Sequence, residues 1–209
     1  LEIKSILSNL ISLIIVFLVI SIFLILIGSS PFEVYLAFID GAFGSRGAAL
    51  LEPYSDDKNN CGLILISNDE FKELALRCRD SGFQLCTHAI GDRGNKMVLD
   101  VYSEIMQGIK NHRWRIEHAQ MVNDVDISRF AKNGIIPSMQ PSHCTSDMRW
   151  IDKRIGPHRV NQISRWKSFI DAGCKIPGGS DCPIEEGNPL FEYYAAITRK
   201  DHLGYPNNG

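Results

Sequence analysis

The sequence has no excess of charge of either sign: 22 lysine and arginine residues stand against 24 aspartate and glutamate residues, which gives a formal net charge of -2. A surface without a strong field has nothing to attract nucleic acid or an anionic membrane, so both are excluded as electrostatic partners. After Asp40 the sequence also lacks internal repeats, low-complexity tracts and a linker. Nothing therefore divides this part of the chain into separate domains.

The cysteines lack the spacing of a disulfide framework or a metal-binding motif. No C-x-x-C pair occurs among the six, which are Cys61, Cys78, Cys86, Cys144, Cys174 and Cys182. This pattern indicates the reduced, scattered thiols of a cytosolic protein. Cys182 is the neighbour of Asp181 and could contact a metal, but packing is its expected role.

One part of the sequence is strongly apolar. Residues 10–27 carry no charged side chain, and extension back to Ile6 gives 22 residues, enough to cross a bilayer core of about 30 Å at about 1.5 Å per residue. We expect residues 1–30 to form a membrane-spanning segment or an uncleaved signal anchor, followed by a domain at residues 31–209. Such a protein would be membrane-anchored, whereas its second domain would otherwise be cytoplasmic.

Two alternatives to a membrane anchor follow from the same run. A cleaved signal peptide would use Lys4 as its charged start and Gly28 near its end, but the run exceeds the usual length of about 7 to 15 apolar residues. A membrane transport component would need further spans, and no other stretch of the sequence reaches 18 apolar residues.

Short apolar runs alternate with amphipathic segments after residue 80, which predicts an α/β fold with a parallel sheet. The predicted strands cover residues 83–88, 114–118, 135–140 and 175–181. The predicted helices cover residues 95–110, 124–133 and 161–172. A further helix from about Asn68 to Arg79 is predicted by the S-x-x-E capping box of Ser67 and Glu70.

Histidine or aspartate stands at the end of three of these strands. His88, His118 and Asp181 hold these positions, and in a (β/α)8 barrel the carboxyl ends of the strands meet at the mouth where the chemistry takes place. Neutral imidazole and carboxylate suit Zn²⁺ and similar divalent metals, which lower the pKa of a bound water to about 7. The three residues therefore predict a metal-dependent hydrolase. Taken singly, each histidine could instead be a hydrogen-bonded core residue, and Asp181 a turn residue.

Longer motifs resemble the metal-dependent amidohydrolase superfamily, in particular the branch that contains N-substituted formamide deformylases. They cover residues 40–57, 88–102, 112–122, 135–150 and 178–199. The resemblance implies a partial TIM barrel, roughly strands four or five to eight, in which His88 and His118 bind a divalent metal, with zinc expected. Asp181 would bind or adjoin the metal and act as general base. The implied reaction is hydrolysis of a carbon–nitrogen bond in a small amide-type substrate by a metal-activated water.

The resemblance also implies substrate contacts from the loops at the mouth. Arg46, Gln140 and His143 lie on these loops in the sequence. Local hydrogen bonding within each loop is the alternative role for all three.

The sequence departs from the family in places that matter for catalysis. The family carries an H-x-H pair on its first strand, which is absent from these 209 residues, and Leu36 stands where a metal-binding lysine is expected. A catalytically inactive remnant is therefore the alternative to an active hydrolase. Four or five parallel strands cannot close a barrel of eight, although a homodimer of half barrels could complete a ring.

The segment that joins the apolar run to the hydrolase motifs resembles a different family. Residues 27–45 are similar to the first membrane helix and following stretch of permease subunits from ABC importers of sugars or nucleosides. Both families share a similar Gly-Ala-x-Gly-Ser run, found here at residues 41–45. We therefore hypothesise a chimera joined within that stretch, with a transport fragment as a further alternative function.

Overall fold

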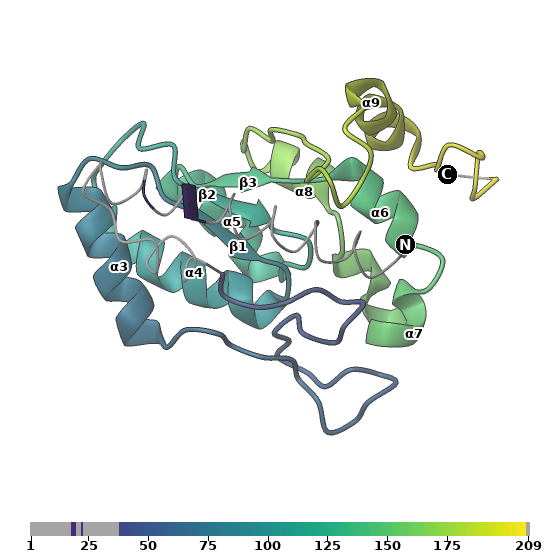
Figure 1. Cartoon of the computed structure of the whole chain (residues 1–209), viewed down its shortest axis with the longest axis horizontal. Coiled ribbons are helices and arrows are strands. Elements are labelled where there is room, and N and C mark those ends of the chain that lie inside the picture. The colour runs from purple at the N-terminus through teal and green to yellow at the C-terminus, as the bar shows by residue number, and fades with distance from the viewer. Residues whose placement is uncertain (1–17, 20–21, 23–37, 208–209) are drawn as a thin grey trace. The chain divides into compact units, whose positions relative to one another are not determined.

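The computed structural model describes residues 18, 19, 22 and 38–207 (Figure 1). The predicted membrane-spanning residues 6–27 lie outside the described part except for 18, 19 and 22, and Leu36 lies outside it as well. Among the described residues, no helix is both long and apolar enough to cross a bilayer. The membrane anchor and the chimera hypothesis thus remain predictions.

A parallel three-stranded sheet forms the centre of the domain and confirms the predicted α/β fold. Its strands are β1 (Cys86–Ala89), β2 (Arg115–His118) and β3 (Ile136–Ser138), in that spatial order. The fourth predicted strand, residues 175–181, is wrong, because this segment contributes only a single bridge at Gly178. His88 lies opposite Glu117, and Ala89 opposite His118, so the two histidines stand at nearly the same level of neighbouring strands. The sheet of the described residues is open, because only single parallel bridges extend it at its two edges, Phe38 to His88 and Met139 to Gly178.

Helices connect the strands as the sequence predicts. α3 (Asn68–Asp80) begins at the predicted capping box, in which both reciprocal hydrogen bonds are present. α5 (Asp124–Asn133) has the predicted bounds and ends at Gly134, whose φ of 67° is the left-handed conformation that favours glycine. The six cysteines are free, as expected.

Two predicted helices need correction. α4 (Asp92–Ile105) begins three residues before the expected residue 95, because Gly91 takes the extended N-cap conformation and Asp92 lies in the first turn. The helix predicted over residues 161–172 is divided into a 3-10 helix, η1 (Pro157–Gln162), and α8 (Trp166–Asp171). Ser164 has a φ of 51° between them, which interrupts a right-handed helix.

The sequence prediction omits three helices near the carboxyl end of the chain. They are α6 (Pro141–Asp147), α7 (Ile151–Ile155) and α9 (Pro189–Thr198). α6 and α7 are too short to show a helical period. In α9 the Asn188 side chain accepts the Leu190 N–H and Pro189 occupies the first turn, an Asn-Pro start that could have been recognised.

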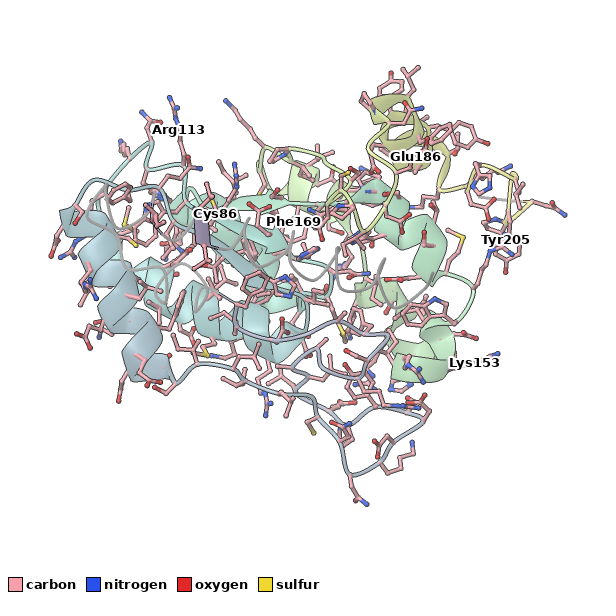
Figure 2. The ribbon with its side chains drawn as sticks, viewed as in Figure 1. Cys86, Arg113, Lys153, Phe169, Glu186 and Tyr205 are labelled. Carbon is pink, nitrogen blue, oxygen red and sulfur yellow. The ribbon has the colours of Figure 1, made fainter. Side chains whose placement is uncertain are left out.

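Large aromatic side chains fill the space between the sheet and the helices α3, α4, α5 and α8. Trp114, Tyr102, Phe130 and Phe169 are each at most 2% exposed. The Phe130 and Phe169 rings meet edge to face with centroids 5.0 Å apart, which joins α5 to α8. Figure 2 shows Phe169 within the domain, whereas the labelled Lys153 side chain projects from its surface.

Truncation of Phe169 tests this packing. We expect Phe169→Ala to lower the free energy of unfolding by about 3 to 5 kcal/mol, because it removes a buried ring and leaves a cavity. The matched control is Ile170→Ala, since Ile170 is the next residue of α8 and is 59% exposed. Urea unfolding followed by tryptophan fluorescence measures both, and equal losses would show that α8 does not pack as described.

Candidate metal centre

Three imidazoles and one carboxylate converge where the strands end. His88 lies in β1, His118 is the last residue of β2, and His143 lies in the first turn of α6. The His88 and His118 ring centroids are 4.5 Å apart, and the His118 and His143 rings stack at 5.6 Å with 10° between their planes. Asp181 places Oδ2 3.8 Å from His118 Nε2.

One subset of these residues has the spacing of a metal-binding group. His118, His143 and Asp181 each offer a ligand atom, and these atoms lie within 4.8 Å of one another. His143, which the sequence suggested as a substrate contact, thus joins two of the predicted metal ligands. His88 lies beside this group through its contact with the His118 ring.

The backbone is strained where it presents two of these residues. His118 has a φ of 70° and Asp181 a φ of 54°, which is a left-handed conformation that non-glycine residues rarely adopt. Such a conformation costs on the order of 1–3 kcal/mol per residue and persists where the surrounding structure holds it in place. At both positions it turns the chain just as the sheet ends.

The imidazoles have nitrogens that no other group of the described residues satisfies. His88 Nε2, His118 Nδ1 and His143 Nε2 are buried and accept or donate no hydrogen bond. A buried polar atom without a partner is costly, on the order of 1–3 kcal/mol. His118 Nδ1 and His143 Nε2 fit the donor set of a divalent metal such as zinc, whereas His88 Nε2 faces Asp40 Oδ1 at 3.6 Å.

Burial keeps these imidazoles neutral. Burial, followed by the positive charges that His118 and His143 would carry, lowers the pKa of His88 to about 3. Burial is also the main cause that lowers the pKa of His118, followed by His143. Because metals bind neutral imidazole, both rings are in the binding form at pH 7.

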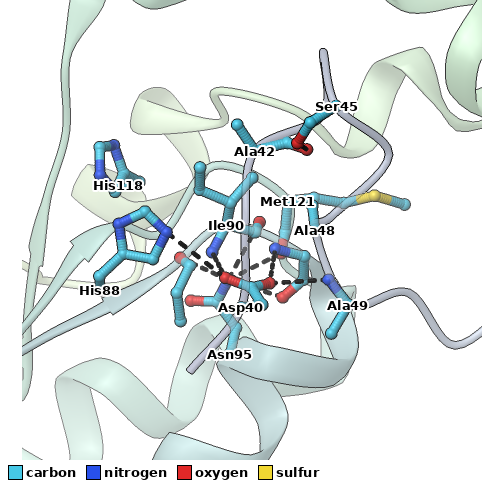
Figure 3. Close-up of polar contacts among 12 residues, drawn as sticks. Asp40, Ala42, Ser45, Ala48, Ala49, His88, Ile90, Asn95, His118 and Met121 are labelled. Carbon is cyan, nitrogen blue, oxygen red and sulfur yellow. Dashed lines mark hydrogen bonds and ion pairs between the residues drawn. The ribbon is translucent and has the colours of Figure 1, made fainter. Parts of the chain in front are cut away.

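A buried carboxylate supports His88 from below (Figure 3). The Asp40 side chain is fully buried, and its Oδ1 lies 3.6 Å from His88 Nε2. Backbone N–H groups of Ala49 and Gly91 donate to Oδ2 at 2.8 Å, and that of Ile90 donates to Oδ1 at 2.9 Å. Burial raises the pKa of Asp40 to about 6, although the three hydrogen bonds oppose this shift. A carboxylate beside the second nitrogen of a histidine is how proteins orient metal ligands.

The other predicted substrate contacts lie in different surroundings. Gln140 is the N-cap of α6 and therefore stands next to the helix that carries His143. The Arg46 guanidinium donates to both carboxylate oxygens of Asp56, at 3.0 and 3.1 Å, and Arg154 pairs with the same carboxylate. Cys182 is exposed and is not part of the metal-binding group of the described residues.

Sequence reasoning missed two features of this centre. Asp40 was treated as a landmark of the loop motif, although an Asp-Gly pair that precedes a loop by itself gives little sign of burial. His143 was assigned to the substrate because the helix α6, which turns it toward His118, is too short to predict from periodicity.

Comparison with known proteins agrees with the fold and shows the family. Residues 34–207 match the amidohydrolase family. The chain is 35% identical over 178 residues to the protein LONG AFTER FAR-RED 3 of Arabidopsis thaliana, which covers 82% of this chain and 30% of that protein. It is also 25% identical to the N-substituted formamide deformylase of Arthrobacter pascens over 171 residues. These residues cover 81% of this chain and 31% of that protein.

A solved structure shows the same arrangement. An uncharacterized metal-dependent hydrolase from Pyrococcus horikoshii OT3 superposes with a TM-score of 0.72 and 32% sequence identity, over 80% of this chain and 34% of that one. The chain thus spans 30% to 34% of the length of these relatives.

The hydrogen bonds of Asp40 can be tested by an isosteric change. Asp40→Asn replaces one buried acceptor with an NH₂ group that faces backbone N–H donors, so we expect the free energy of unfolding to fall by about 2 kcal/mol or more. Asp80→Asn is the control, because the Asp80 side chain is 66% exposed. Chemical denaturation measures both, and an unchanged midpoint for Asp40→Asn would show that the carboxylate does not hold the loop.

The lowered pKa of His88 predicts a loss of stability in acid. A histidine in the unfolded chain has a pKa of about 6.5, whereas His88 in the folded chain has a pKa of about 3. Between these two pH values only the unfolded chain binds the proton, so the free energy of unfolding falls as the pH falls below about 6.5. Asp40 acts in the opposite direction, because its raised pKa adds stability as the pH falls below about 6.

Comparison with His88→Asn isolates the histidine from this opposing effect. Between pH 7 and pH 5 we expect the unsubstituted chain to lose about 2 kcal/mol more than His88→Asn does. Urea unfolding in EDTA at each pH measures the difference. Identical pH profiles would mean that His88 is not held neutral by burial.

Proposed function

Because this chain belongs to the amidohydrolase family, we propose that it holds a divalent metal and hydrolyses a carbon–nitrogen bond in a small amide-type substrate. The observation that carries the proposal is the cluster of buried imidazole nitrogens without hydrogen-bond partners, placed beside the Asp181 carboxylate at the strand ends. Family membership makes the chain an amidohydrolase-type protein, and the cluster provides the place where such chemistry could occur.

The residues at this place divide into holding and reacting groups. We assign His88, His118 and Asp181 to the metal, and the geometry supports adding His143 to them. A zinc ion bound there would supply Lewis acidity to a water and to the substrate carbonyl. The donor set of imidazole and carboxylate suits zinc, and the described group includes no thiolate.

Asp181 is the group that we propose as general base. Its side chain is 44% exposed, whereas that of His118 is 7% exposed, so the carboxylate can reach a water molecule and a substrate. A carboxylate in this position accepts the proton of the attacking water and can return it to the leaving nitrogen. Asp40, deeper in the protein, orients His88 and has no contact with solvent.

The nature of the substrate rests on the comparisons and on the residues near Asp181. One relative is named as an N-substituted formamide deformylase, which supports an amide-type substrate. Gln140 remains a proposed substrate contact, because it is the N-cap of α6 beside the cluster, whereas His143 is proposed as a metal ligand instead. Arg46 could contribute only if it released Asp56.

Metal content is the direct test. We expect the full chain, purified in a mild detergent, to contain about one zinc ion, and His118→Ala to contain at least about tenfold less. His202→Ala is the matched control, because His202 is exposed near the end of the described chain. Mass spectrometry measures the metal, and a panel of N-substituted formamides and N-acyl amines tests hydrolysis. A folded chain that binds no metal would refute the proposed function.

A further inference from the structure

A cavity of about 680 Å³ lies between α8, α9 and residues 176–180. Its wall is mostly apolar and includes Trp166, Ile176 and Tyr193. Sites for small molecules generally measure about 300 to 1,000 Å³ and combine an apolar wall with a few polar groups. The cavity therefore has the size and the lining of a ligand site.

One carboxylate lies in this wall. Glu192 is 8% exposed, and its Oε2 accepts the Ser142 N–H at 3.0 Å. Its Oε1 is buried without a hydrogen-bond partner among the described residues. A carboxylate oxygen removed from water in this way is costly unless a donor or a cation reaches it.

The neighbouring cation does not fill that role. Arg199 lies over the Trp166 ring, with its Cζ 4.2 Å from the ring centroid. Its guanidinium donates to the Ser164 carbonyl and to the Cys144 sulfur. Among the described residues that line the cavity, Glu192 has the single charged side chain.

The cavity adjoins the metal centre without sharing its ligands. Ser180 lines the cavity and directly precedes Asp181. Met139 and Pro141 also line it, on either side of Gln140. A molecule that occupied the cavity would therefore lie next to the segments that carry the proposed general base and a proposed substrate contact.

We propose that the cavity binds a primary ammonium group carried on a compact aromatic or aliphatic body. The Glu192 carboxylate accepts an N–H of the ammonium group, and the apolar wall holds the body. The assignment of this ligand to a reaction rests on the proposed function: the substrate would be an amide that carries an ammonium group away from the bond to be cleaved. Binding of the ammonium group itself requires neither metal nor catalysis.

Two probes of nearly equal shape separate charge from size. Benzylammonium carries the proposed group, and benzyl alcohol replaces it with a neutral hydroxyl. We expect the full chain in EDTA to bind benzylammonium at least about tenfold more tightly than benzyl alcohol, because a hydrogen bond to a charged pair is stronger than a neutral one. Isothermal titration calorimetry measures both, and equal affinities would overturn the proposal.

Three variants locate the binding. Glu192→Gln keeps an acceptor for the Ser142 N–H but removes the charge, so benzylammonium should bind about tenfold more weakly and benzyl alcohol should be unaffected. Ala196→Leu fills the cavity without a change of charge and should weaken both probes. Glu185→Gln is the control, because Glu185 does not line this cavity and its carboxylate accepts a hydrogen bond from the Ser146 hydroxyl instead.

The outcomes separate this proposal from the function on which its substrate rests. Unchanged benzylammonium affinity in Glu192→Gln would overturn the ammonium site even if the chain binds zinc. Ammonium selectivity that is lost in Glu192→Gln would support the site even if no zinc is found. If circular dichroism shows that Glu192→Gln is unfolded, Ala196→Leu decides: retained binding of benzylammonium in that variant would overturn the proposal, and its loss would support it.

Discussion

The buried carboxylate of Asp40 ties together the chain segments from which the metal centre is built. Its hydrogen bonds reach Ala49 in the loop that follows it and Ile90 and Gly91 at the end of β1. Hydrogen bonds from backbone N–H groups to a charged carboxylate are stronger than neutral ones, and here they satisfy three donors that have no access to water. His88 stands between this network and the other imidazoles, so the position of this proposed ligand depends on a residue that has no contact with solvent.

The same burial that secures the centre also sets its chemistry. Imidazoles withdrawn from water lose their affinity for protons, which favours the neutral form that the proposed metal would need, but their unpaired nitrogens destabilise the fold while no partner reaches them. Binding and stability are therefore linked, as they are in other proteins whose metal ligands lack alternative partners. The left-handed backbone at His118 and Asp181 is a second cost to stability at this place. A relaxed backbone there would direct the two side chains elsewhere.

Local signals in the sequence predicted those parts of the fold whose cause is local. α5 follows from its periodicity and from Gly134, and α3 follows from the capping box of Ser67 and Glu70. The break at Ser164 could not be predicted, because a serine in the left-handed conformation is imposed by tertiary contacts. For the proposed centre, His88, His118 and Asp181 were predicted from the ends of the expected strands, although residues 175–181 form a single bridge at Gly178 and no strand. The proximity of His143 and the burial of Asp40 depend on how distant segments pack.

The hydrogen bonds that Asp40 accepts determine which neighbouring positions tolerate substitution during evolution. All three donors are backbone amides, which every residue except proline supplies, so substitutions at Ala49 and Ile90 leave these hydrogen bonds intact wherever the new side chain fits. Gly91 is less free, because a Cβ there would lie 2.0 Å from the Ala49 carbonyl oxygen. Substitutions can therefore change most of the residues around these hydrogen bonds. The acceptor itself is supplied by the Asp40 carboxylate, so replacement of Asp40 by an apolar residue removes all three hydrogen bonds at once.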